Sequence, residues 1–150
     1  MNVSKWLKYS IRTLEFANQV GAKYAIIHLW SVHFFWKWVA DKIHKYQVKK
    51  NVSDAFGDAR FQKLLCKVLD KIRGKKEKHM DLLRESLDEL VPIAQERGII
   101  LGFENREDLE ELPMDEDMPN LLEEYADCPN VGYWYDPEHS QEKFDYGYFA

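Results

Sequence analysis

The stretch Val131–Gln141 runs from apolar and aromatic residues directly into residues that can do chemistry. Asp136 and His139 stand three positions apart, just after Val-Gly-Tyr-Trp-Tyr, a segment whose composition predicts a strand over 131–135. A carboxylate and an imidazole at a strand tip can bind a divalent metal ion or transfer a proton. For one such tip alone, an ordinary polar exit loop is the simpler explanation.

Two further predicted strands end in the same kind of residue. His28 lies near the end of the apolar run 24–29, and Glu104 follows the apolar run 99–103. The carboxyl ends of parallel strands meet at one edge of a sheet, so we expect these groups to converge with the third strand end. Their carboxylates and imidazoles suit Mn²⁺, Mg²⁺, Co²⁺, Zn²⁺ or Fe²⁺ without choosing among them. The agreement of three strand ends favours a site.

Helical patterns alternate with these strands. Apolar spacing predicts helices over residues 4–20, 30–46, 54–73, 77–97 and 119–126. Gly74 is expected to close the third helix, and Pro92 is expected to kink or break the fourth, because proline cannot donate a backbone hydrogen bond. A polar, acidic loop is expected from the second strand to about Met118. Apolar strands separated by helices indicate right-handed parallel crossover units, so the predicted class is α/β.

Glu104-Asn-Arg106 follows an apolar strand, and about thirty residues later comes the turn Asp136-Pro-Glu-His139. A helical segment with an internal proline, Leu90–Gly98, precedes the first of these motifs. Together they resemble the xylose isomerase-like TIM barrels, which include sugar-phosphate isomerases and epimerases and the abasic-site endonucleases. The resemblance covers most of residues 4–148.

The resemblance implies roles for the strand-end residues. Glu104 would be a metal ligand that also exchanges a proton with the sugar, and Asp136 would be the next metal ligand. His139 resembles the histidine of the family's Asp-x-x-His turn, which contacts substrate in the epimerases or binds a further metal in the endonucleases. Glu104 and His139 are therefore the implied catalytic residues.

Two more residues are implied to bind substrate. His28 matches the family's strand-end histidine, although Leu29-Trp30 follows it where many members have Pro-Gly. Arg106 would bind a substrate oxyanion or phosphate. The implied activity is that of a metal-dependent sugar or sugar-phosphate isomerase or epimerase, which transfers a proton next to a carbonyl with the help of a divalent cation.

The length does not fit a whole barrel. An eight-stranded α/β barrel needs about 250 residues, whereas this chain has 150 and three predicted strands. The family's later ligands, a histidine and a second glutamate, have no counterpart. We therefore expect a single partial β/α-barrel domain over residues 1–150, with a helical insertion at about 33–74. Its open sheet edges favour a homo-oligomer or pairing with a complementing chain.

Composition limits the class of protein. With 45% apolar residues the chain can form one core, and no apolar run approaches the roughly 20 residues needed to cross a bilayer. The amino-terminal segment lacks the apolar core of a signal peptide, so a cytoplasmic protein without a membrane partner is expected. Cys66 and Cys128 lack metal-binding or redox spacing.

Charge is divided sharply along the chain and leaves alternatives open. Residues 1–80 hold 17 Lys and Arg against 6 Asp and Glu, while residues 81–150 hold 4 against 20. The basic half favours an abasic-site endonuclease relative, but solvated helix faces neutralised by the acidic half are the simpler explanation, so nucleic acid is an unlikely partner. A third interpretation is a non-catalytic, self-associating interaction module that uses the aromatic segment 30–46, for which core packing is the simpler explanation.

Overall fold

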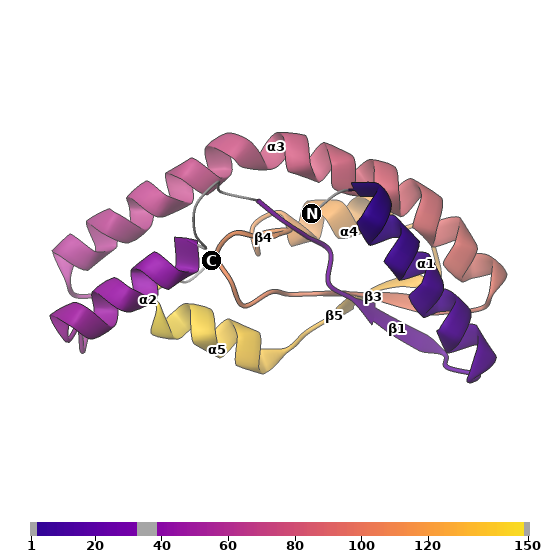
Figure 1. Ribbon diagram of the computed structural model, residues 1–150, viewed down its shortest axis with the longest axis horizontal. Helices are drawn as coiled ribbons and strands as arrows, with labels where there is room; N and C mark the ends of the chain where they lie inside the picture. The colour runs from indigo at the N-terminus through magenta and orange to yellow at the C-terminus, as the bar shows by residue number, and fades with distance from the viewer. Residues whose placement is uncertain (1–2, 33–38, 149–150) are drawn as a thin grey trace.

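Helices and strands alternate along the chain in the computed structural model, which describes residues 3–32 and 39–148. This arrangement confirms the predicted α/β class (Figure 1). The elements in order are α1 (Val3–Gln19), β1 (Tyr24–Ile27), β2 (Trp30–Ser31), α2 (Val39–Lys50), α3 (Ala59–Glu96), β3 (Ile100–Glu104), β4 (Glu111–Leu112), α4 (Met118–Glu124), β5 (Val131–Trp134) and α5 (Pro137–Asp145).

The larger sheet of the described residues has three parallel strands in the order β1-β3-β5. Its register aligns Ile27 with Phe103, and Glu104 with Trp134. The central strand β3 therefore ends in Glu104, one of the predicted site residues, and has an edge strand on each side. The three strands predicted from apolar runs are all present.

One face of this sheet is covered by helices and the other is open. Side chains alternate between the faces of a strand, and Ile27, Leu101 and Phe103 on one face are at most 5% exposed. α1, α3 and α4 lie on one side of the strands, while α5 lies beyond their carboxyl ends (Figure 1). On the opposite face Tyr24 and Trp134 are 58% and 45% exposed. The register places Glu104 on the face of Trp134.

α3 is one helix of 38 residues where the sequence predicts two. The expectation that Gly74 ends a helix is wrong, because the core-facing stripe continues across it from Ile72 to Met80. Lys76 occupies the intermediate position, where its side chain is 12% exposed and its Nζ lies 2.6 Å from Asp117 Oδ1. The ion pair satisfies a cation that would otherwise interrupt the apolar stripe, so no break is needed.

α3 also continues through Pro92 and ends at Glu96. Pro92 and Asp88 both lie on the exposed face, so water can reach the Asp88 carbonyl that lacks its usual helical donor. The expected break at this proline is therefore absent. Gly98 follows the helix with a φ of 63°, a left-handed conformation that suits glycine, as its position in the sequence predicts.

The helix predicted over residues 30–46 is wrong at its beginning. Trp30 and Ser31 form β2, which pairs antiparallel with β4 at Leu112 and Glu111. Residues 33–38, which carry much of the aromatic segment and the start of the predicted insertion, lie outside the described residues. α2 begins at Val39. The β2-β4 pair ties the segment after β1 to the loop after β3.

The two charged halves of the chain pair with one another. Arg73 Nη2 lies 2.7 Å from Glu116 Oε2, and Arg84 Nε lies 2.8 Å from Glu124 Oε2. These contacts join basic residues of α3 to acidic residues in and before α4, which agrees with the simpler explanation of the charge division. Among the described helices, none has both the length and the apolar composition required to traverse a bilayer.

Candidate functional site

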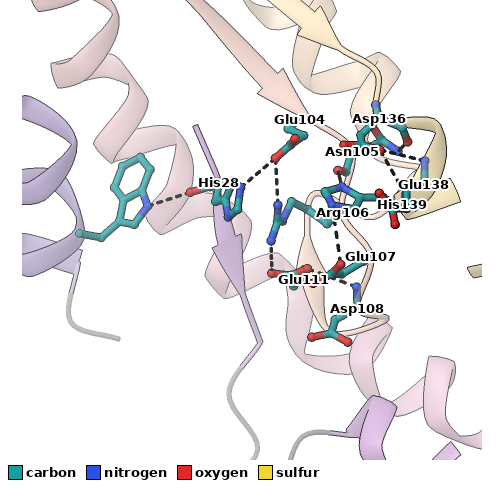
Figure 2. A network of polar contacts seen from close by, with 11 residues as sticks. His28, Glu104, Asn105, Arg106, Glu107, Asp108, Glu111, Asp136, Glu138 and His139 are labelled. Atoms are coloured by element: carbon teal, nitrogen blue, oxygen red, sulfur yellow. Dashed lines mark hydrogen bonds and ion pairs between the residues drawn. The ribbon is translucent and has the colours of Figure 1, made fainter. Parts of the chain in front are cut away.

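The carboxyl ends of β3 and β5 bring three predicted site residues together. Glu104 is the last residue of β3, Asp136 follows β5, and His139 lies in the first turn of α5. One potential ligand atom from each residue lies within 4.8 Å of the others. Figure 2 shows the three side chains gathered where the strands end. The convergence expected from the strand ends is therefore present.

Asp136 also has a local structural role. It is the N-cap of α5, where its side chain accepts hydrogen bonds from the backbone N–H groups of Glu138 and His139. The Asp136 Oδ1 atom accepts both, at 2.8 and 3.4 Å. Pro137 occupies the first helical turn, a favoured position because its missing N–H is not needed there. Capping uses one carboxylate oxygen, so Oδ2 is the oxygen available to a ligand.

His139 is held in an orientation that suits a metal ligand. Its Nδ1 lies 2.8 Å from the backbone carbonyl oxygen of Asn105. A carbonyl only accepts hydrogen bonds, so Nδ1 carries the hydrogen and the neutral ring presents a lone pair at Nε2. That Nε2 lies 3.6 Å from Glu107 Oε2. A protonated ring would pair with Glu107, so a proton and a metal ion compete for the same nitrogen.

Asn105 joins the two strand ends and was not assigned a role from the sequence. Its Nδ2 donates to the Asp136 carbonyl at 2.8 Å and to Ser140 Oγ at 3.1 Å. Its Oδ1 accepts from the Asp136 backbone N–H at 2.6 Å. The residue is 2% exposed. An amide directly after a strand-end carboxylate is the sequence signal that could have identified this positioning residue.

Glu104 is held by two cationic or proton-carrying partners. Arg106 Nη1 lies 3.0 Å and His28 Nε2 lies 2.9 Å from the same oxygen, Glu104 Oε2 (Figure 2). The Glu104 side chain is 8% exposed, whereas the His28 side chain is 66% exposed. These contacts fix the carboxylate and leave Oε1 as the oxygen for a metal ion or a substrate proton. His28 therefore belongs to the site, on its solvent side.

Arg106 lies inside the protein between two carboxylates. Its side chain is 5% exposed, and its Nη2 donates to Glu111 Oε1 at 2.7 Å. Glu111 comes from β4, so the small antiparallel pair supplies the far end of this network. The ion pair between Glu104 and Arg106 gives Glu104 a structural role that does not depend on a metal ion. An arginine held this way can position Glu104 whether or not an ion binds.

The donor set fits a divalent cation. Bonds from Zn²⁺ to oxygen or nitrogen are about 2.0–2.2 Å, so two ligand atoms of one such ion lie no more than about 4.4 Å apart. The side chains of Glu104, Asp136 and His139, within 4.8 Å of one another, would need to close by a few tenths of an ångström. Two carboxylates and one imidazole suit Mn²⁺, Fe²⁺, Co²⁺ or Zn²⁺. Three protein ligands leave coordination positions for a substrate.

Asp108 is an acidic residue near the site that was not identified from the sequence. Burial raises its pKa to about 6, with the carboxylates of Glu110, Glu111 and Glu107 adding to the effect and Arg106 opposing it. Its backbone N–H donates to Glu111 Oε2 at 3.2 Å. The cluster of acidic residues between positions 104 and 111 is the feature of the sequence that could have identified Asp108. Such a carboxyl group exchanges protons near neutral pH.

The described site thus consists of the triad of Glu104, Asp136 and His139, its positioning residues Asn105 and Arg106, and the exposed imidazole of His28. Comparisons of the chain with protein-family models, with curated proteins and with solved structures find no match.

Proposed function

We propose that this chain binds a divalent cation through Glu104, Asp136 and His139 and acts as an isomerase-like or epimerase-like protein on a sugar or sugar phosphate. The observation that supports the proposal most is the approach of the three ligand atoms to within 4.8 Å of one another. The fixed tautomer of His139 adds to it, since the contact of Nδ1 with the Asn105 carbonyl leaves the lone pair of the neutral ring on Nε2. When bound, the cation would polarise the carbonyl and hydroxyl oxygens of the sugar.

Glu104 is the proposed proton carrier. It would take the proton from the carbon next to the carbonyl and return it to the former carbonyl carbon, and transfer of the hydroxyl proton to the former carbonyl oxygen would complete an isomerisation. Arg106 and His28 hold one of its oxygens, at 3.0 and 2.9 Å, so the other oxygen would have to leave the ion before it takes the proton. A base fixed by two partners on a strand end meets the positional accuracy that proton transfer requires.

Epimerisation needs a second proton-carrying group, because the proton must return to the opposite face of the same carbon. His139 is the proposed second group, and it can serve only while its Nε2 is not bound to the ion. Isomerisation needs no such change and is the simpler reaction for these residues. His28, with its side chain 66% exposed, is the proposed contact for a substrate hydroxyl.

Metal binding is tested with Asp136→Asn. Asparagine caps a helix about as well as aspartate, so this variant keeps the cap of α5 and removes one ligand charge. Asp58→Asn is a matched control, since Asp58 caps α3 through the same two kinds of backbone hydrogen bond. We expect Mn²⁺ to raise the unfolding temperature of the parent and of Asp58→Asn, and to bind Asp136→Asn about tenfold or more weakly.

The reaction is tested by incorporation of solvent deuterium next to the carbonyl of aldoses, ketoses and their phosphates, followed by NMR with Mn²⁺ present. Exchange that is lost in Glu104→Gln and kept in Asp58→Asn would support the proposal. Equal Mn²⁺ binding by Asp136→Asn and Asp58→Asn, or no binding by the parent, would refute the metal site. Metal binding without any exchange would refute the proton-transfer step alone.

A further inference from the structure

A cavity of about 280 Å³ lies beside β5, between α5 and the loop that precedes α4. The register aligns Tyr133 with Phe103, so Tyr133 points to the helix-covered side of the sheet, whereas Glu104 and Trp134 point to the other side. The cavity is therefore on a different face of the sheet from the metal-binding triad. Aromatic rings of Tyr133, Tyr135, Phe144 and Tyr148 form much of its wall.

A buried ion pair forms the polar part of this cavity. Lys143 is 4% exposed, although it lies on a short helix at the surface of the fold. Its Nζ lies 2.9 and 3.0 Å from the two carboxylate oxygens of Asp115. Both residues line the cavity. An ammonium group has three N–H donors, so the two bonds to Asp115 leave one donor that a ligand can use.

Tyr148 supplies a second polar group to the wall. The residue is 7% exposed, and its hydroxyl is buried with no hydrogen-bond partner among the described residues. Burial, together with the charges of Asp115 and Glu116, raises the pKa of Tyr148 to about 12, so the hydroxyl keeps its proton near neutral pH. A buried hydroxyl without a partner is costly. The hydroxyl is inaccessible as it stands, so a ligand in the cavity would accept its hydrogen bond after a small shift of the ring, which would remove that cost.

The chemistry of the wall selects a class of ligand. Asp115 neutralises Lys143, so the cavity has little net attraction for either an anion or a cation. Its groups both donate and accept hydrogen bonds, as alcohol groups require. The aromatic rings suit the C–H face of a saturated ring. The volume lies at the small end of the range of about 300–1,000 Å³ for ligand sites, which fits a molecule with one ring.

We propose that this cavity is a binding site for a polyhydroxylated ring of monosaccharide size, separate from the metal-binding triad. The ring would lie against Tyr133 and Tyr135, accept hydrogen bonds from Lys143 and Tyr148, and donate to Asp115. Ser140 lines the cavity and also accepts a hydrogen bond from Asn105 at 3.1 Å. It is therefore unsuitable for a test that must leave the other site intact.

The test measures saturation-transfer NMR and calorimetric titration of the whole chain with D-glucose, D-xylose and myo-inositol. Tetramethylammonium, benzoate and phenol serve as cationic, anionic and aromatic probes. We expect the polyols to bind in the millimolar range and the other probes to bind more weakly. Tighter binding of any of the three other probes than of every polyol would overturn the proposed class.

Tyr148→Phe locates the site without removing a hydrogen bond from the described fold, since its hydroxyl has no partner there. We expect this variant to fold and to bind the polyols about tenfold more weakly. Tyr9→Phe is the matched control, because Tyr9 is 52% exposed on α1. Tyr133→Ala should also weaken binding of myo-inositol, which has no carbonyl group and so is no substrate for the proposed isomerase reaction. Unchanged affinity in both Tyr148→Phe and Tyr133→Ala, or no polyol binding by the parent, would overturn the site.

Discussion

His139 directs its Nδ1 at the backbone carbonyl oxygen of Asn105, 2.8 Å away, and its Nε2 lies 3.6 Å from Glu107 Oε2. The contact connects a helix-borne imidazole to the residue that follows the central strand. Both the choice of tautomer and the direction of the ring depend on a backbone atom, which a side-chain substitution at position 105 does not remove. The orientation is therefore a property of the fold.

Protons should compete with the metal ion at His139. Metal affinity should fall as the pH is lowered, because a nitrogen must be deprotonated to bind a metal ion. His139→Gln should bind Mn²⁺ more weakly and lose part of this pH dependence. Electron paramagnetic resonance of free Mn²⁺ at two pH values measures both effects. An unchanged pH dependence in His139→Gln would place the titrating ligand elsewhere.

Removing Arg106 should be one of the most damaging substitutions in the chain. Arg106→Met leaves Glu104 and Glu111 facing each other's charge inside the protein, and breaking a buried ion pair in this way costs about 3–5 kcal/mol. The control is Arg84→Met, whose partner Glu124 is 39% exposed at the side chain. An exposed pair contributes about 0–1 kcal/mol. Urea unfolding of the two variants should therefore differ severalfold, and equal losses would contradict the positioning role.

Asp108 should make the protein less stable as pH rises. Its pKa is raised from 3.8 to about 6 in the folded state, so its favourable contribution is complete below pH 3.8 and is lost as pH rises through 6. Asp108→Asn should raise the free energy of unfolding at neutral pH by about 1–2 kcal/mol, after allowance for partial solvent exposure. Urea unfolding at several pH values measures the change. Equal stability of parent and variant at neutral pH would contradict it.

Glu116 should have the opposite pH dependence. Hydrogen bonds from Arg73 and Lys76, opposed by burial, lower its pKa from 4.5 to about 2. Its contribution is therefore present above pH 4.5 and is lost as pH falls through 2. Glu116→Gln should lower the free energy of unfolding at neutral pH by about 1–2 kcal/mol, since one third of the side chain is exposed to screening solvent. The loss should shrink in acid, and a loss independent of pH would exclude the ion pairs as its cause.

Gly74→Ala should stabilise the protein. Gly74 lies inside α3, and a Cβ added there meets no heavy atom within 4 Å. Alanine is favoured over glycine in an exposed helix by about 1 kcal/mol. Gly98→Ala is the contrasting control, because its φ of 63° is strained for alanine. The unfolding temperature should rise for Gly74→Ala and fall for Gly98→Ala. A lower unfolding temperature for Gly74→Ala would contradict a continuous helix.

The strands and their convergence could be predicted because apolar runs and the parallel crossover rule carry that information. Glu104 and Asp136 were expected at one edge of the sheet, and they lie there. The ion pair between Glu104 and Arg106, two residues apart, can be expected from the sequence, whereas the contact between Glu104 and His28 cannot, because His28 lies in a distant segment. The sequence pattern also did not reveal that Glu111, in a two-residue strand, would hold the other end of Arg106.

Helix boundaries were harder to predict where a charged side chain takes an apolar position. Gly74 predicted the end of a helix, but the stripe of α3 continues past it through Lys76, whose partners Glu116 and Asp117 lie far along the chain. α5 was overlooked because Asp136-Pro137 resembles the start of a loop as much as an N-cap followed by proline. For α3 the deciding interaction joins residues that are distant in the sequence. For α5 it is the geometry of the N-cap.

α3 is long enough to connect α2 at one end of the protein with α1 and the sheet at the other. At about 1.5 Å per residue, its 38 residues extend for roughly 57 Å, and it packs against α1, α2, β2 and β3. Loss of helix near the middle would release the sheet at one end and α2 at the other. Heat should therefore melt the two ends together, as one cooperative unit, with Lys76 and its acidic partners near the centre of that unit.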